Sequence, residues 1–285
     1  MHTLFFPVDD YDPESTLECG QAFRWTRVGL GWEGIVSGHW LRVESVRGGL
    51  QVQLVKDPGA SQWVRDYFSV DEDFSAILAG FPQDIPMRAA VASSRGLRIL
   101  RQEPWECLAS FICSSTKQIV QIRQIVQTLA ARLGRKMMGA EGQQLRYAFP
   151  DPYEFLQAGE TVLRECKMGF RAPYLMDAAR RICTGQLDLV AINALPTPAA
   201  RNALMLIDGV GPKIADCVLL FAYGRQDAFP IDVWVRRALK DLYFPEVKKI
   251  TDAELELFSR SYFGAYSGYA QQYLFHYIRR RFNEK

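Results

Sequence analysis

Clustered cysteines, long apolar runs and a large net charge are all missing from this 285-residue sequence. Its six cysteines are scattered, and no two of them form a C-x-x-C pair. This spacing excludes a zinc finger and a clustered iron–sulfur site, and it fits reduced thiols in an intracellular protein. We therefore expect no metal cluster and no cofactor.

The apolar residues never form a run of about 18, the length that a membrane-spanning helix needs. The first residues, MHTLFFPVDDYDPE, lack a basic segment and soon become acidic, so we expect no secretory signal. Hydrophobic residues make up 48% and charged residues 23%, which is typical of a soluble globular protein. The length allows one large domain or two ordinary ones.

The net charge is only +2, so overall charge does not indicate a nucleic-acid-binding protein. It does not exclude one either. A protein that holds DNA mainly through oriented backbone amides and a few arginines does not need a strongly basic composition.

The first third of the chain favours strands. Apolar and polar residues partly alternate over residues 31–55, on both sides of a turn at Arg47-Gly48-Gly49. This pattern predicts a small antiparallel sheet, followed by a helix around residues 60–79.

From about residue 87 the apolar spacing becomes helical. Apolar residues recur every three or four positions from Ile119 to Leu133, and Gly134 is expected to end that helix at its C′ position. Further helices are predicted near 105–114, 153–158, 173–184, 198–206, 212–223, 232–243, 252–262 and 267–282. The chain is thus predicted to be α+β, with a β-rich domain at 1–104 and a helical domain at 105–285.

The most informative stretch is residues 204–217, LMLIDGVGPKIADC. Gly209 and Gly211 allow a tight turn, and Pro212 occupies a favoured first-turn position of a helix. This indicates a helix–hairpin–helix whose free amides at Gly209, Gly211 and Lys213 point at a DNA phosphate. An ordinary turn between two helices is the alternative. Such a hairpin can also bind a monovalent cation, here through the carbonyls of Met205, Ile207 and Val210.

Lys213 begins the second helix of this hairpin and is a candidate nucleophile. The helix dipole disfavours an ammonium there by only about 0.3–1 kcal/mol, so burial would have to supply most of the activation. A phosphate-binding or solvated surface lysine is the alternative.

Asp232 follows nineteen residues after Lys213, in the run FPIDVWV. It is a good N-cap for the next predicted helix, and a helix N-terminus favours the ionised carboxylate. A carboxylate held near a sugar C1′ stabilises the positive charge that develops as a glycosidic bond breaks. A plain helix cap is the alternative, and only the pairing with Lys213 distinguishes the two.

The pair LxGVGxKxAD and PxDV resembles the helix–hairpin–helix DNA glycosylase superfamily, and the lysine resembles its bifunctional glycosylase/lyase members. Within that superfamily the chain resembles the 8-oxoguanine DNA glycosylases, over nearly its whole length. Four further segments carry this resemblance: 20–25 (GQAFRW), 106–115 (ECLASFICSS), 168–172 (MGFRA) and 268–275 (GYAQQYLF). It implies an N-terminal antiparallel sheet domain (TBP-like), an all-helical glycosylase body, and 8-oxoguanine-containing duplex DNA as the partner.

The resemblance implies a role for each matching residue. Lys213 would attack C1′ and form a Schiff base that permits β-elimination, and Asp232 would stabilise the oxocarbenium-like sugar. The Gly20 carbonyl would accept the N7–H that distinguishes 8-oxoguanine from guanine. Three further residues would read the edge of the flipped base or sandwich its ring, namely Gln271 for the edge and Phe275 and Cys217 for the ring.

Each of these base-binding residues also has an ordinary structural interpretation. Gln271 and Phe275, four residues apart, could be one face of a packed helix, and Gly20 a plain strand glycine. Cys217 could be a small buried hydrophobic residue. Because it is four residues from Lys213, a thiolate–ammonium dipole between the two is a further hypothesis.

A flipped base leaves a hole in the duplex. Phe170 matches the family's aromatic wedge, and the adjacent Arg171 would contact the orphaned base. A buried loop aromatic and a surface arginine are the alternatives.

Three positions depart from the family's eukaryotic pattern. Thr116 replaces a gap-filling asparagine, Gln121 replaces an arginine that reads the opposite cytosine, and Trp234 replaces a phosphate-binding histidine. These changes predict a prokaryotic-type member with relaxed opposite-base discrimination. We expect a cytoplasmic, nucleoid-associated monomer.

Two other functions are compatible with some of these motifs. A monofunctional alkyl-base glycosylase would need only Asp232 and water, so Lys213 argues against it. A non-catalytic hairpin module that binds the DNA backbone gives no reason for Gly20, Gln271 and Phe275 to accompany Lys213.

Overall fold

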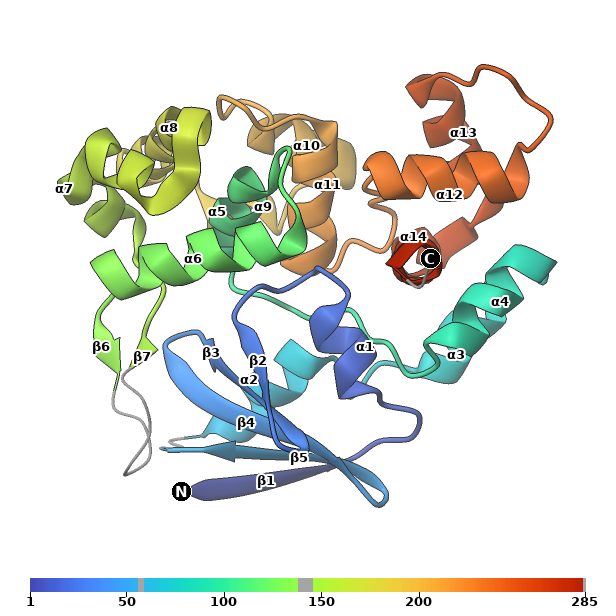
Figure 1. Cartoon of the computed structure of the whole chain (residues 1–285), viewed down its shortest axis with the longest axis horizontal. Helices are drawn as coiled ribbons and strands as arrows, with labels where there is room; N and C mark the ends of the chain where they lie inside the picture. Colours follow the sequence, from blue (N-terminus) through green and yellow to red (C-terminus); the bar gives the residue numbers. More distant parts are fainter. Residues whose placement is uncertain (56–58, 138–145, 284–285) are drawn as a thin grey trace.

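A five-stranded antiparallel sheet lies on one side of the molecule and a body of helices on the other (Figure 1). The computed structural model describes residues 1–55, 59–137 and 146–283. The strands of the sheet are β1 (His2–Pro7), β2 (Trp25–Val28), β3 (Gly31–Val36), β4 (His39–Val46) and β5 (Gly49–Leu54). The predicted order, a sheet followed by helices, is confirmed.

The sheet forms because its strands alternate. On β4 and β5 the register pairs Leu41 with Leu54 and Val43 with Val52, and all four side chains are fully buried. The predicted sheet over 31–55 and its turn before Gly49 are therefore confirmed. The sequence patterns missed β1 and β2, which complete the sheet in the order β1-β5-β4-β3-β2.

The single helix predicted around 60–79 is wrong. The chain forms α2 (Ala60–Phe68) and α3 (Phe74–Ala79), separated by a turn that begins at Ser69. Ser69 has a φ of 51°, and its hydroxyl donates to the Ile99 carbonyl at 2.7 Å. A tertiary hydrogen bond thus fixes a left-handed residue where the apolar pattern continues.

Two short helices flank these, α1 (Pro13–Glu18) and α4 (Ile85–Ser93). The remaining helices build the body: α5 (Pro104–Ser114), α6 (Ile119–Leu133), α7 (Pro152–Leu163), α8 (Ala172–Cys183), α9 (Leu189–Ile192), α10 (Thr197–Leu204), α11 (Pro212–Phe221), α12 (Val233–Tyr243), α13 (Asp252–Tyr262) and α14 (Ser267–Asn283). The helices predicted from residue 105 onward are confirmed, with small shifts at their ends. A two-stranded ribbon of β6 (Lys136–Met137) and β7 (Arg146–Tyr147) was not predicted.

Helix α6 ends at Leu133 as predicted, but for a different reason. Gly134 has a φ of −76° and a ψ of 155°, so it is extended and not a left-handed C′ residue. A side chain at this position would collide with the Ala148 carbonyl, and glycine is needed for this close approach of two backbones.

Residues 97–102, which we call the crossing segment, connect the sheet region to the helical body. The Tyr269 hydroxyl of α14 accepts from the Ile99 amide at 3.1 Å, and that of Tyr273 donates to the Leu97 carbonyl at 3.3 Å. Both tyrosines are fully buried. The crossing segment therefore fixes α14 relative to the N-terminal part of the chain.

Among the helices described, no segment has both the length and the apolar composition that crossing a bilayer requires. The division into domains after residue 104 stays a prediction.

Candidate active site

The predicted hairpin lies between α10 and α11. An ion pair at 2.6 Å between Arg201 of α10 and Asp216 of α11 ties the two helices together. Gly209 has a φ of 77°, and the ring of Tyr174 occupies the space that a side chain there would need. Glycine is thus required at 209 both for its backbone conformation and for its packing.

The hairpin presents unpaired amides. Within the described residues, the N–H groups of Gly209 and Gly211 donate to no acceptor, while the Asp208 amide is held by Asp177 at 3.1 Å. Gly211 has an ordinary φ of −95°, and no atom lies within 4 Å of where its side chain would be. Because Gly211 has no side chain, the space in front of the helix N-terminus stays open and an anion can approach it.

The proposed cation site remains a prediction. The Ile207 carbonyl accepts the Val210 amide at 3.1 Å, which leaves one lone pair for a cation. Within the described ranges no three His, Cys, Asp or Glu side chains gather closely enough to bind a metal ion.

A cavity of about 320 Å³ opens beside the hairpin. Six of the residues predicted to act on the sugar or the base line it together: Gly20, Lys213, Cys217, Asp232, Gln271 and Phe275. The other lining residues are Phe111, Phe221, Pro230 and Gln272. We call residues 19–25 the N-terminal segment. Residues from this segment, α5, α11 and α14 thus meet at one cavity.

Lys213 projects from the first turn of α11. Its Nζ donates to the Ser114 hydroxyl at 3.2 Å and lies 5.3 Å from the centre of the Phe111 ring. The Ser114 hydroxyl in turn donates to the Phe111 carbonyl at 2.6 Å. The amine is therefore aimed by a serine and an aromatic face, and no ion pair links it to Asp232 within the described part of the chain.

Asp232 is the N-cap of α12, as predicted. One of its carboxylate oxygens accepts the amides of Trp234 at 2.9 Å and Val235 at 2.8 Å. Burial raises the pKa of this carboxyl above its usual value, opposed by the Val235 amide and the charge of Lys213. The backbone amides and the lysine favour the ionised form of a group that the cavity would otherwise neutralise.

Cys217 lies one helical turn beyond Lys213 on α11 and is buried. Burial raises its pKa to about 12, although Lys213 acts in the opposite direction. The hypothesis of a thiolate–ammonium dipole is therefore not supported, since the neutral thiol is the favoured form. A small buried thiol still provides a flat wall for a base.

Other residues of the cavity lining come from α14. The amide oxygen of Gln271 is buried and has no hydrogen-bond partner within the described residues. Buried polar atoms are rarely left unpaired, so this oxygen marks a place for a donor that enters the cavity. Phe275 lies one turn further along, and the Arg279 guanidinium is 5.2 Å from the centre of its ring.

Gly20 closes the cavity from the N-terminal segment. Its φ of 81° is readily adopted only by glycine. A Cβ at this position would lie 2.5 Å from the end of the Ile119 side chain and 3.5 Å from the Phe275 ring. The segment therefore passes close to both α6 and α14.

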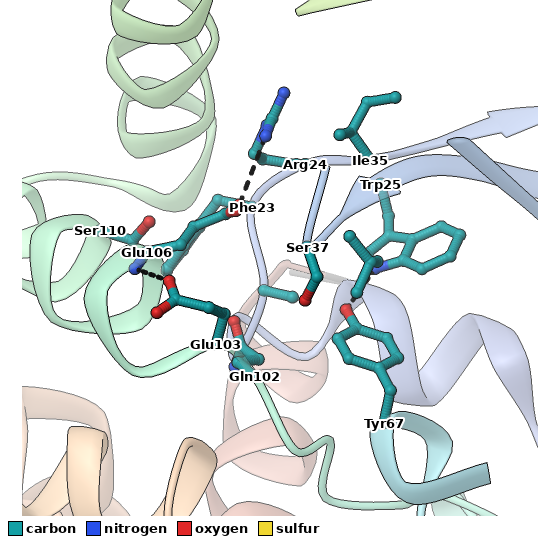
Figure 2. Close-up of a pocket in the computed structure, with 12 residues that line it drawn as sticks. Phe23, Arg24, Trp25, Ile35, Ser37, Tyr67, Gln102, Glu103, Glu106 and Ser110 are labelled. Carbon is teal, nitrogen blue, oxygen red and sulfur yellow. Dashed lines mark hydrogen bonds and ion pairs between the residues drawn. The ribbon is translucent and has the colours of Figure 1, made fainter. Parts of the chain in front are cut away.

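A second cavity, of about 350 Å³, lies next to residues 22–25 of the same segment (Figure 2). Arg24 faces Glu106 there at 3.6 Å, and the two side chains are only 9% and 19% exposed. Burial raises the pKa of Glu106 to about 7, although Arg24 lowers it. The Trp25 indole donates to the Tyr67 hydroxyl at 2.8 Å, and both residues also line this cavity.

The predicted wedge lies on a short 3-10 helix, Gly169–Arg171, directly before α8. Phe170 is 51% exposed, and the Arg171 guanidinium lies 4.2 Å from the centre of its ring. Arg171 is itself buried, donating to the Ser115 carbonyl at 2.8 Å and to the Thr116 hydroxyl at 2.6 Å. It is therefore not a surface arginine, and its predicted contact with an orphaned base would have to be added to these bonds.

Thr116, Gln121 and Trp234 lie outside the cavity lining. Thr116 has a φ of 55°, a strained conformation for a β-branched residue. The Gln121 side chain accepts the Gln118 amide at 3.1 Å and so caps α6. Trp234 packs against Phe282 with ring centres 5.9 Å apart.

Sequence reasoning missed the residues that hold the site in place. Ser114 and Phe111 lie within the segment 106–115 that carried the resemblance, but no role was assigned to either. Gln272 follows Gln271 directly, and its side chain donates to the Cys19 carbonyl. Nothing in the local pattern distinguishes these three from ordinary core residues.

Comparison with known proteins covers both halves of this architecture. The model of the 8-oxoguanine DNA glycosylase N-terminal domain matches residues 3–108, and that of the HhH-GPD superfamily of base excision DNA repair proteins matches residues 109–260. The chain belongs to the 8-oxoguanine DNA glycosylase family of this superfamily. The resemblance that the motifs indicated is thereby confirmed.

Relatives of this family match over nearly the full chain. A protein of Methanothermobacter thermautotrophicus named probable N-glycosylase/DNA lyase is 30% identical over 96% of this chain and 95% of its own. The structure of MBOgg1 with a low-affinity DNA ligand is 33% identical, with a TM-score of 0.92 over 99% of both chains. The Clostridium acetobutylicum 8-oxoguanine glycosylase/lyase, solved with duplex DNA containing cytosine opposite 8-oxoguanine, is 30% identical, with a TM-score of 0.90 over 98% of both chains.

Proposed function

We propose that this chain excises 8-oxoguanine from duplex DNA and then cleaves the resulting site by β-elimination, through a Schiff base at Lys213. The observation that carries the proposal is a single cavity lined by an amine, a carboxylate, an unpaired amide oxygen and a glycine of the N-terminal segment. A nucleotide uses all four groups: the amine and the carboxylate act on its sugar, and the amide oxygen and the glycine contact its base.

Lys213 supplies the nucleophile. Its amine, held by Ser114 at 3.2 Å, forms a bond to C1′ while the glycosidic bond breaks and its electron pair leaves with the base. The Asp232 carboxylate stabilises the positive charge that builds on the sugar during this step. Ring opening then gives the Schiff base, and loss of a C2′ proton expels the 3′ phosphate.

Base selection uses the other side of the cavity. The Gly20 carbonyl accepts the N7–H of 8-oxoguanine, whereas guanine would present a lone pair there and be repelled. The Gln271 amide oxygen accepts from the N–H groups on the Watson–Crick edge of the extruded base. Phe275 and Cys217 sandwich the ring.

The DNA backbone and the hole left by the base engage other residues. The Gly209 and Gly211 amides bind a phosphate, and Phe170 enters the duplex as a wedge beside Arg171. Thr116 and Gln121 replace side chains on which family members depend for opposite-base contacts, so discrimination against bases other than cytosine is relaxed. Trp234 replaces a phosphate-binding histidine. The enzyme acts as a monomer in the cytoplasm, at the nucleoid.

Two observations argue against the alternatives. A monofunctional alkyl-base glycosylase has no use for an amine held in the cavity by Ser114. A hairpin that only binds the DNA backbone has no use for the buried, unpaired Gln271 oxygen.

Reductive trapping tests the proposal. The chain is incubated with borohydride and a duplex containing 8-oxoguanine, beside Lys213→Gln and, as a matched control, the exposed Lys248→Gln. We expect a covalent adduct from the unmodified chain and from Lys248→Gln, and none from Lys213→Gln. An adduct of equal yield from Lys213→Gln would exclude this lysine as the nucleophile.

The same duplex with each of the four bases opposite the lesion tests the relaxed discrimination. We expect excision rates within about tenfold of one another, because the contacts that would distinguish the opposite base, each worth about 1–3 kcal/mol of discrimination, are absent. A rate with cytosine that exceeds all others by a thousandfold would contradict this part of the proposal.

A further inference from the structure

The backbone carbonyls of Cys19, Gly20 and Gln21, consecutive in the N-terminal segment, differ in their hydrogen bonding. The Cys19 carbonyl accepts the side-chain amide of Gln272 at 3.0 Å, and the Gln21 carbonyl accepts that of Gln102 at 2.7 Å. No residue in the described ranges donates to the Gly20 carbonyl between them. The two outer carbonyls are therefore fixed, and the one at the cavity is left unpaired.

The Gln21 side chain holds the same segment from the opposite direction. It donates to the carbonyls of Thr16 and Arg98, both at 2.8 Å, and accepts the Leu100 amide at 2.9 Å. This side chain is fully buried. A buried amide held by three hydrogen bonds is rigid, because breaking any one of them leaves an unpaired polar group.

Gln272 differs from the other two glutamines in its location. It lies on α14, between Gln271 and Phe275, and it also lines the cavity. The helix that carries the proposed base-reading residues is thus bonded directly to the residue before Gly20. The separation between the Gly20 carbonyl and the Gln271 amide is set by this bond and by α14 itself.

We propose that Gln272 is a positioning residue for lesion selectivity: its bond to the Cys19 carbonyl fixes the direction of the Gly20 carbonyl, which distinguishes 8-oxoguanine from guanine. This inference rests on the proposed function. A mobile carbonyl could turn toward the N7–H of 8-oxoguanine and also turn away from the N7 lone pair of guanine. It would then accept both bases, so discrimination between them requires a carbonyl that is held in place. Tight positioning of a reading group commonly depends on such supporting hydrogen bonds.

The test is a cycle between a protein change and a substrate change. Gln272→Met keeps the size of the side chain and removes the donor, and 7-deaza-8-oxoguanine keeps the C8 carbonyl and removes the N7–H. Both proteins carry Lys213→Gln, so that duplex binding is measured without excision. Gln62→Met, at an exposed glutamine of α2 that lines neither cavity, is the matched control.

We expect Gln272→Met to weaken binding of the 8-oxoguanine duplex by about three- to tenfold, as for loss of one neutral hydrogen bond, and to leave binding of the deaza duplex nearly unchanged. Gln62→Met should change neither. Equal weakening of both duplexes would show a merely structural role and overturn the proposal, and so would no weakening at all.

A second variant protects the test against misfolding. Gln102→Met removes the bond to the Gln21 carbonyl from the other end, and we expect a loss in the same direction, again confined to the 8-oxoguanine duplex. If Gln272→Met does not fold, this variant decides the matter. Failure of the unmodified chain to bind or excise 8-oxoguanine at all would instead overturn the proposed function, so the two failures are distinguishable.

Discussion

Each of the two cavities beside the N-terminal segment contains a carboxyl group and a basic side chain, but the two pairs are arranged differently. In one, Asp232 shares the space with Lys213, and in the other Glu106 faces Arg24. Burial raises the pKa of both carboxyls. Only the first cavity also contains the groups expected of a reactive site.

The difference lies first in the backbone. Asp232 precedes α12 and accepts two of its free amides, whereas Glu106 lies inside the first turn of α5. There the amides of Trp105 and Glu106 are already taken by Glu103, at 3.0 and 2.7 Å. Glu106 lies one turn after the N-cap position, so only the nearby Arg24 favours its ionised form.

The cations differ as well. An amine can give up its proton and become a nucleophile, but a guanidinium remains charged at any physiological pH. Lysine in the first cavity permits covalent chemistry, and arginine in the second permits only an ion pair. A buried acid and base thus become a reactive site only when the position of the acid on its helix and the kind of base are both suitable.

Replacing the carboxylate of the first cavity should give the largest effect. Asp232→Asn keeps an oxygen for the α12 cap but removes the charge, and we expect 8-oxoguanine excision to fall about 10²–10³-fold. The matched control is Asp188→Asn at the N-cap of α9, where the same two-amide arrangement lies outside the cavity. Single-turnover excision measures both, and a loss below threefold for Asp232→Asn would remove its electrostatic role.

The same change in the second cavity should alter stability and leave excision within about twofold. The pKa of Glu106 is about 7 when folded and is ordinarily 4.5, so the folded state binds the proton more tightly. The free energy of unfolding therefore falls as pH rises from about 4.5 to about 7, by about 3 kcal/mol.

Glu106→Gln should remove this part of the pH dependence, measured by urea denaturation at pH 5 and pH 8. Glu160→Gln, which alters an exposed ion pair with Arg164, is the control and should leave the slope unchanged. Parallel pH curves for the unmodified chain and Glu106→Gln would show that this carboxyl titrates normally.

The segment between the cavities should tolerate little. Gly20→Ala forces alanine into a left-handed conformation, which costs about 1–2 kcal/mol of stability. Gly185→Ala is a matched control, because Gly185 has a φ of 73° and no atom near where its side chain would be. Gly185→Ala should lose this stability alone in thermal denaturation. Gly20→Ala should lose at least as much, because its Cβ would displace the end of the Ile119 side chain, and only this variant should also lose excision activity.

The smallest effect concerns the serine that aims Lys213. Ser114→Ala removes the acceptor at 3.2 Å, and we expect Schiff-base trapping to slow by about three- to tenfold, as for one hydrogen bond. Ser93→Ala is the control, since the Ser93 hydroxyl makes the same local bond to a carbonyl three residues earlier. Equal trapping rates in both variants would show that Ser114 serves only its own helix.

The sequence predicted what depends on neighbours along the chain. Residues 119–133 show a helical apolar period and form that helix, and Lys213 and Asp232 were predicted as a pair from two short motifs. Strand β1 was missed because its pairing partner, β5, lies more than forty residues away. The break at Ser69 was missed because Ile99 causes it.

The same limit applies within the site. Ser114 reaches Lys213 across 99 residues, and Gln272 reaches Cys19 across 253. Such bonds leave no periodic trace, because they depend on how finished elements pack. The reactive groups were therefore predictable, while the groups that aim them had to be found in three dimensions.

The bond between Gln272 and Cys19 has a consequence for folding. Lys213 and Asp232 are nineteen residues apart in sequence, whereas the bond between Gln272 and Cys19 closes a loop of 253 residues and so costs more conformational entropy. Reactivity is in this sense a local property of the chain, and fidelity is a global one. If the sheet and α14 separated transiently, Lys213 would remain able to react while the Gly20 carbonyl would no longer be held in the direction that distinguishes 8-oxoguanine from guanine.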